Sequence, residues 1–170
     1  MAKLTRGRYI IYIDASFGGT QPEWFKVGKS LSSLTVDLSP DVSTEKNIFD
    51  EVFSTDNGYS PQASVDPYYA NPEDAIYTKL KDIAMNRLLG DACKTKIMEV
   101  VVDTDDPSAN TFDAWTEDVL IKPTSTGGDT SGFAIPFNVF FDGNRTAGSA
   151  RYETGTYKTG SPTFTPYAGA

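Results

Sequence analysis

Apolar and polar residues alternate along most of this chain, in short segments separated by turn residues. In residues 133–141, five large apolar residues share one face: Phe133, Ile135, Phe137, Val139 and Phe141. Alternation with a period of two is typical of β-strands with one buried face. The same kind of pattern predicts further strands over residues 8–14, 23–27, 33–38, 95–103 and 112–122.

One segment has the longer period of an α-helix. Five apolar residues fall on a single helical face: Ile76, Leu80, Ile83, Ala84 and Leu88. Asn71 is a favoured N-cap and Pro72 a favoured first residue, while Gly90 is a typical C-terminal stop. We therefore predict one helix over about residues 72–89, with its apolar face packed against a sheet.

Two short glycine-containing motifs are strong turn signals. Asp-Asn-Gly at residues 56–58 predicts a turn within the long stretch after Pro40. Asp-Gly-Asn at residues 142–144 predicts a turn into a hairpin over residues 145–157. Short strands, frequent turns and one helix indicate a mainly β fold: a two-sheet antiparallel β-sandwich or flattened barrel with one flanking α-helix. A chain of 170 residues is expected to form one domain, residues 1–170.

Acidic residues are concentrated in one part of the chain. The net charge is −8, and positions 37–74 contain nine acids but only one base, Lys46. The acids are Asp37, Asp41, Glu45, Asp50, Glu51, Asp56, Asp66, Glu73 and Asp74. Tight nucleic-acid binding needs clustered lysine and arginine, so this segment is unsuited to it. Residues 37–60 are expected to form a long acidic loop, either a solvated surface loop or a projection that serves binding.

The residue types that most often carry catalysis are scarce. Histidine is absent and Cys93 is the single cysteine, which excludes a Ser-His-Asp triad and argues against a transition-metal site. Residues 28–30 (Gly-Lys-Ser) resemble a phosphate-binding loop, but Glu23 stands where its first glycine is needed. The acids within residues 103–106 lack the bidentate glutamate of a calcium loop, because Ala114 occupies that position. We expect no enzymatic activity, no cofactor and no metal site.

With little catalytic chemistry, function is expected to lie in shape and assembly. Open sheet edges can pair with those of identical subunits, and a suitable rotation closes such subunits into a ring. No apolar run approaches the ~18–20 residues of a transmembrane helix, and no secretory signal is evident. We therefore expect a soluble chain that does not bind membranes.

Three stretches of the sequence together resemble a known family. They are residues 32–52, 56–104 and 114–145, of which SVDPYYA at residues 64–70 and residues 127–145 are the most distinctive. The whole pattern is similar to that of the major tail tube proteins of siphophages, the phages with long non-contractile tails, that infect Gram-positive bacteria. Residues 1–8 and 154–170 are less similar to this family, and we expect them to be N-terminal and C-terminal arms.

The resemblance implies a virion protein with a β-sandwich and a flanking helix, assembled in the bacterial host cytoplasm. Such proteins form hexameric rings that stack into a tube, through which double-stranded DNA passes without specific binding. Other implied partners are a tape-measure protein, a tail terminator and distal tail proteins. A long loop commonly reaches into the neighbouring ring, and the lumen is usually acidic. Candidates for ring stacking or for the lumen are therefore Asp37, Asp41, Glu45, Asp50, Glu51 and Asp56.

Two other functions fit the same sequence. The tube protein of a contractile tail or of a secretion-type injection apparatus shares this architecture, and a sheath partner would distinguish it. A monomeric carbohydrate-binding β-sandwich is suggested by nine tyrosines and two tryptophans. It predicts an exposed aromatic platform at Tyr68, Tyr69 or Trp24, and no ring formation.

Overall fold

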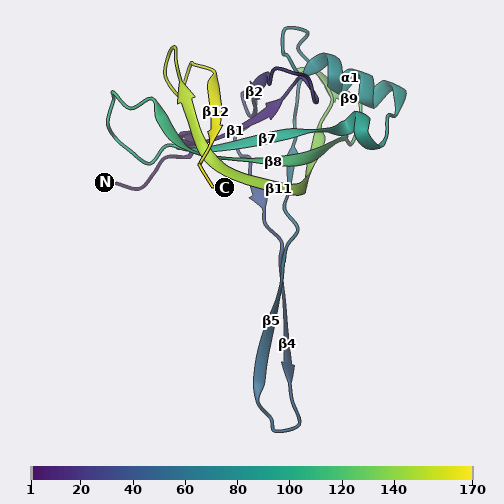
Figure 1. The fold of residues 1–170 in the computed structure, drawn as a ribbon. Coiled ribbons are helices and arrows are strands. Elements are labelled where there is room, and N and C mark those ends of the chain that lie inside the picture. The colour runs from purple at the N-terminus through teal and green to yellow at the C-terminus, as the bar shows by residue number, and fades with distance from the viewer. Residues whose placement is uncertain (1, 170) are drawn as a thin grey trace.

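A curled antiparallel sheet forms the body of the protein, with one helix beside it and one long hairpin projecting from it (Figure 1). This computed structural model describes residues 2–169. The main sheet has eight strands in the order β2-β1-β7-β8-β11-β6-β3, with β12 paired to β11. The elements are β1 (Tyr9–Asp14), β2 (Trp24–Lys26), β3 (Val36–Asp37), β4 (Pro40–Lys46), β5 (Val52–Tyr59), β6 (Gln62–Val65), α1 (Tyr77–Asn86), β7 (Lys94–Val101), β8 (Thr111–Pro123), β9 (Gly127–Asp129), β10 (Gly132–Ala134), β11 (Phe137–Tyr152) and β12 (Pro162–Pro166), with 3-10 turns at Arg6–Arg8 and Gly90–Cys93. The predicted fold class, mainly antiparallel β with one flanking helix, is confirmed.

Strand β11 connects the two ends of the sheet. It pairs with β8 along most of its length, while its first residues also pair with β6 and its last residues with β12. Its register shifts between Phe141 and Thr146, where Gly143 and Asn144 have positive φ of 99° and 57°. Such a bulge bends a strand and increases its twist. The predicted turn at residues 142–144 and the hairpin over 145–157 are therefore wrong, because one strand continues through the bulge.

Both faces of the sheet are buried near its centre. On β1, Ile11 and Ile13 point into a core that includes Leu80 of α1, whereas Ile10 and Tyr12 point into a second core on the other face. Burial on both faces explains why residues 9–13 are continuously apolar instead of alternating. The sheet therefore lies between two cores, and its edges and the hairpin lie outside them.

The helix is shorter than the sequence pattern predicts. α1 begins at Tyr77, and the predicted N-cap Asn71 instead accepts a hydrogen bond that closes a separate turn before it. α1 ends where Arg87 adopts a left-handed φ of 51°, so the predicted stop at Gly90 is not used. The range of about 72–89 is corrected to residues 77–86 because these flanking turns already satisfy the backbone groups at both ends.

The strands predicted over residues 8–14, 23–27, 95–103 and 112–122 agree closely with the structure, and two other segments differ. Residues 33–38 contain only the two-residue strand β3. Residues 133–141 are divided between β10 and β11, and Pro136 lies in the break. Proline has no backbone N–H to donate to a neighbouring strand, so it separates the two elements.

Both segments predicted as arms contact the body. Arg8 forms an ion pair with Asp105 at 2.5 Å, and β12 lies within residues 154–170 and extends the sheet. Met1 and Ala170, which belong to these predicted arms, lie outside the described residues.

Gly148 of β11 allows β12 to approach closely. A Cβ atom at this position would lie 2.3 Å from the carbonyl oxygen of Thr165 and 2.6 Å from the ring of Phe164. Gly148→Ala is therefore expected to displace β12 and to lower the free energy of unfolding by about 1–3 kcal/mol. Denaturant unfolding measures the change, with Gly7→Ala as a control because a Cβ there meets nothing within 4 Å. A Gly148→Ala protein as stable as the wild type would contradict this packing.

Candidate assembly surface

The segment that the sequence marked as an acidic loop is a β-hairpin that projects away from the body (Figure 1). Among the strands of residues 2–169, β4 and β5 pair with no strand but each other. Their register is continuous from the pair Val42 and Asp56 to the pair Lys46 and Val52. At ~3.3 Å per residue, strands of this length extend about 20–25 Å. The predicted turn at residues 56–58 is wrong: these residues lie inside β5, and Gly58 (φ 95°) takes part in a bulge near its end.

The actual turn of the hairpin is organised by Asn47. Its side-chain oxygen accepts hydrogen bonds from the backbone N–H groups of Phe49 (2.9 Å) and Glu51 (3.1 Å), and its amide donates to the Glu51 carboxylate at 2.7 Å. Asp50 has a positive φ of 61°. Asparagine commonly stabilises turns through such side-chain bonds to nearby backbone. The tip is thus a defined turn that presents Ile48 and Phe49 to solvent.

The hairpin exposes an unusual share of the apolar surface. Six of the thirteen large apolar side chains that are exposed within residues 2–169 lie on it: Val42, Ile48, Phe49, Val52, Phe53 and Tyr59. Ile48 is 93% exposed and Phe49 is 75% exposed. A two-stranded ribbon by itself is only marginally stable in water, and clustered exposed apolar groups mark interaction sites. We refer to these six exposed side chains, with Ile48 and Phe49 at the tip, as the hairpin surface.

The acids proposed from the sequence gather on this same hairpin. Asp41 and Glu45 lie on β4, Asp50 and Glu51 in the tip, and Asp56 on β5, all of them exposed. Asp37 lies apart from them, on β3 at the edge of the sheet. Within the described residues none of the six forms an ion pair. The structure therefore brings five of the six predicted residues together, as unpaired negative charge on one projecting element.

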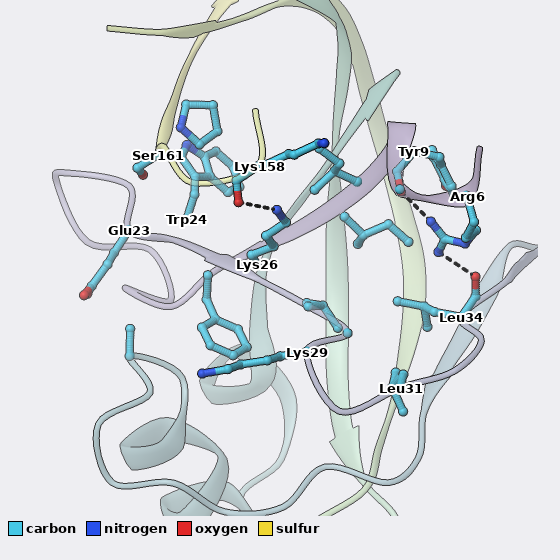
Figure 2. A pocket seen from close by; sticks show the side chains of 18 of the residues that line it. Arg6, Tyr9, Glu23, Trp24, Lys26, Lys29, Leu31, Leu34, Lys158 and Ser161 are labelled. Carbon is cyan, nitrogen blue, oxygen red and sulfur yellow. Dashed lines mark hydrogen bonds between the residues drawn. The ribbon is translucent and has the colours of Figure 1, made fainter. Parts of the chain in front are cut away.

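A second feature, which the sequence did not indicate, is a cleft beside β1 and β2 (Figure 2). It has a volume of about 1070 Å³, and its apolar lining comes from Ile11, Phe25, Val27, Leu31 and Leu34. Four basic side chains surround this lining, Arg6, Lys26, Lys29 and Lys158, against one acid, Glu23. The contributing segments are distant in the sequence, so no local motif could have revealed the cleft.

The basic residues of the cleft are held in different ways. Arg6 donates hydrogen bonds to the carbonyl oxygens of Tyr9 and Leu34, the latter at 2.8 Å (Figure 2). Lys26 donates to the Lys158 carbonyl at 3.1 Å, and burial lowers the pKa of Lys26. Within residues 2–169 none of the four basic side chains forms an ion pair. Their positive charge is therefore available to a ligand or partner.

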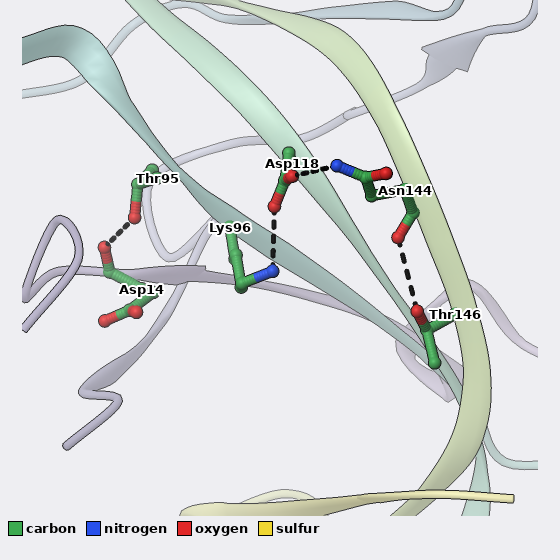
Figure 3. Close-up of polar contacts among 6 residues, drawn as sticks. All are labelled: Asp14, Thr95, Lys96, Asp118, Asn144 and Thr146. Atoms are coloured by element: carbon green, nitrogen blue, oxygen red, sulfur yellow. Dashed lines mark hydrogen bonds and ion pairs between the residues drawn. The ribbon is translucent and has the colours of Figure 1, made fainter. Parts of the chain in front are cut away.

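Polar contacts fix the strands that carry these surfaces (Figure 3). Lys96 of β7 and Asn144 in the β11 bulge both donate to Asp118 of β8, at 2.8 and 2.7 Å. The hydrogen bond from Asn144 lowers the pKa of Asp118 most, and the hydrogen bond from Lys96 is the next largest cause, so this pKa lies below its usual range. Thr95 donates to the Asp14 carbonyl at 2.5 Å, which joins β7 to the end of β1. These contacts hold the bulge in place and are structural in character.

Arg145 connects two buried carboxylates on neighbouring strands. It donates to Glu99 of β7 at 2.6 Å and to Glu117 of β8 at 3.5 Å. Both glutamates are 6% exposed, and the arginine lies at the end of the β11 bulge. Burial raises the pKa of Glu117, and Arg145 opposes this only in part. The group therefore links β7 and β8 to the bulge of β11.

The other candidate chemistry has structural explanations. Tyr68 is buried with its ring against Phe137, which removes it from the aromatic platform of a carbohydrate-binding module. Tyr69 is half-buried and donates to Asp129 of β9 at 3.0 Å. Cys93 is buried, as expected of a small apolar residue. Among residues 2–169 no three potential metal-binding side chains cluster together, and no helix there has the length and apolarity needed to cross a membrane.

The fold is similar to that of two solved structures. The sheath/tube terminator of the PVC extracellular contractile injection system, in its extended state, superposes with a TM-score of 0.52 at 16% identity, covering 86% of this chain and 97% of that chain. The tube-terminating cap of the anti-feeding prophage gives a TM-score of 0.51 at 15% identity, covering 86% and 91%. The chain therefore has a tail-tube-like fold. No protein-family model matches it, and neither does any curated protein.

Proposed function

We propose that this chain is a structural subunit, without enzymatic activity, of the tube of a phage-like tail or injection apparatus. The observation that carries the proposal is the projecting hairpin, with its exposed apolar side chains and unpaired acids. An isolated ribbon gains stability only when a partner covers its apolar groups. A tail-tube-like fold supports the same role, since both solved relatives are named as tube terminators.

Two kinds of apparatus are compatible with this proposal. The sequence resemblance favours a siphophage tail tube, whereas the solved structures of similar fold come from contractile injection systems. We give more weight to the contractile alternative because the fold likeness extends over 86% of the chain. In either apparatus, subunits close into rings of six and the rings stack through the hairpin into a tube. A tape-measure protein and a terminator would then set the length of that tube.

The proposal also assigns a role to the acidic residues. Acids that face the lumen would repel the phosphates of passing DNA, and acids between rings would orient one ring on the next. The open edges at β2 and β3 are suited to side-by-side contacts within a ring, because unpaired edge strands bind other strands readily.

Removing four hairpin acids is expected to shorten the tubes or to slow DNA ejection, because the charge that orients or repels is lost. The variant combines Asp41→Ala, Glu45→Ala, Asp50→Ala and Glu51→Ala. Tube length in electron micrographs and ejection kinetics measure the effects. An equal charge change on exposed acids of the body is the control: Glu73→Ala, Asp82→Ala, Asp103→Ala and Asp142→Ala. Normal tubes and normal ejection in the first variant would remove these acids from the proposal.

The proposal as a whole is tested by negative-stain electron microscopy of the purified protein, with light scattering across a range of concentrations. Rings or hollow tubes that grow with concentration are expected. A monodisperse monomer at high concentration, even when preformed tail or injection-apparatus baseplates are supplied as nuclei, would contradict a tube subunit. A glycan-binding screen would then test the carbohydrate-binding alternative.

A further inference from the structure

The cleft lies along a part of β1 that lacks a neighbouring strand. β2 pairs in register with Tyr12–Asp14 at the far end of β1, and the Val27 N–H adds one hydrogen bond to the Ile11 carbonyl at 2.9 Å. Before Ile11, no strand within residues 2–169 pairs with this side of β1. Arg6 covers part of this open edge through its hydrogen bond to the Tyr9 carbonyl. Unpaired strand edges with apolar residues beside them favour the binding of another chain.

The cleft and the hairpin tip are complementary in chemistry. The cleft has an apolar floor and a rim of four cations against one acid, a local charge of +3. The tip has two exposed apolar residues, Ile48 and Phe49, and the hairpin carries five acids against Lys46, a local charge of −4. Within residues 2–169 of one subunit, neither set of charged side chains forms an ion pair.

The hairpin tip and the wall of the cleft formed by β2 lie far apart in one subunit. In Figure 1 the hairpin extends below the sheet, whereas β2, which forms one wall of the cleft, lies above β7 and β8. A subunit therefore cannot place its tip in its own cleft. Contacts between different surfaces of identical subunits propagate head to tail, and they build an open stack where the rotation does not close a ring.

We propose that the cleft receives the hairpin tip of a second copy of this chain. The inference rests on the proposed stacking function and names the site that stacking uses. Ile48 and Phe49 would enter the apolar floor beside Val27 and Leu31, and the acids of the hairpin would meet Lys29 and Lys158 at the rim. At about 1070 Å³ the cleft exceeds the ~300–1,000 Å³ of typical small-molecule sites, so a two-residue turn fits.

Photocrosslinking of the full chain locates the receptor for the tip. Phe49 is replaced by the photoreactive aromatic residue p-benzoylphenylalanine, and adducts between subunits are mapped by mass spectrometry. We expect adducts on residues 24–34. Lys29→Glu with Lys158→Glu is expected to reduce them about tenfold, because two attractive contacts become repulsive. Both lysines are exposed, and within residues 2–169 neither side chain donates a hydrogen bond, so we expect the fold to be retained.

A reciprocal exchange of charge separates direct contact from an indirect effect. Adding Glu45→Lys and Glu51→Lys to the cleft variant is expected to restore the adducts, whereas Lys79→Glu with Lys81→Glu on α1 should leave them unchanged. If assemblies form but the adducts map outside residues 24–34, or if the charge exchange does not restore them, the cleft is not the receptor. The proposed function would still stand in either case. The absence of both adducts and assemblies would overturn both.

Discussion

Arg145→Leu is expected to destabilise the domain by about 2–4 kcal/mol, because Glu99 and Glu117 would stay buried without their cation. Breaking a fully buried ion pair costs more, but the Arg145 side chain is 42% exposed and solvent screens part of the interaction. Urea unfolding followed by circular dichroism measures the change in the free energy of unfolding. The bulge of β11 and the sheet curl that depends on it are the parts that we expect to loosen first.

Two further variants make this prediction specific. Arg151→Leu, on the same strand, removes an exposed arginine that pairs with exposed Glu153 and is expected to cost less than about 1 kcal/mol. Adding Glu99→Gln and Glu117→Gln to Arg145→Leu should recover part of the loss, because neutral amides are less costly to bury than unpaired carboxylates. Equal effects of Arg145→Leu and Arg151→Leu would show that the buried arrangement contributes nothing special.

The loss in Arg145→Leu should also depend on pH. Burial already raises the pKa of Glu117, and removal of Arg145 takes away an effect that lowers it. A carboxyl whose pKa is higher in the folded than in the unfolded state binds protons preferentially when folded. Its contribution to stability therefore falls as pH rises through the folded pKa. The deficit relative to wild type is expected to be largest near about pH 7 and to shrink toward about pH 5.

Ile48→Ser with Phe49→Ser is expected to abolish stacking while leaving the folded monomer unchanged. Covering an isoleucine or a phenylalanine contributes about 1.5–3 kcal/mol each, so every subunit contact would lose about 3–6 kcal/mol. Both side chains already face water in the single subunit, so its melting temperature should not move. Sedimentation velocity and electron microscopy measure the assembly, and calorimetry measures the monomer.

A surface control separates the tip from general apolar character. Leu89 is 79% exposed on the body of the protein, and Leu89→Ser removes a comparable apolar group. Assembly of the Leu89→Ser protein should match that of the wild type. Tubes of normal length from the Ile48→Ser, Phe49→Ser protein would mean that the hairpin tip is not the stacking element.

The sequence identified the acidic segment but not its shape. Asp-Asn-Gly at residues 56–58 and Asp-Gly-Asn at residues 142–144 were interpreted as turns, and both form bulges. A turn and a bulge need the same residues, because each requires positive φ that glycine and asparagine adopt at low cost. Pairing with the neighbouring strand determines which one forms, and that partner is remote in the sequence.

The candidate site was predictable only where its residues are consecutive. Five of the six predicted acids lie within 16 residues on one hairpin, so local composition located them. Ile48 and Phe49 were missed, although two adjacent large apolar residues inside an acidic stretch were a visible signal of a contact point. The cleft combines Arg6, Lys29 and Lys158, and no local pattern relates these positions.

The strand pattern, the single helix, the scarcity of catalytic residues and the acidic segment all follow from local order along the chain. Side-chain periodicity and composition are local properties, and they limit the fold class before any long-range contact forms. The course of β11 through its bulge, the assembly of the cleft from separate segments, and the burial of Glu99 and Glu117 depend on contacts between distant parts of the chain. Strand pairing and register are determined by which side chains the core buries, and local propensity does not predict this.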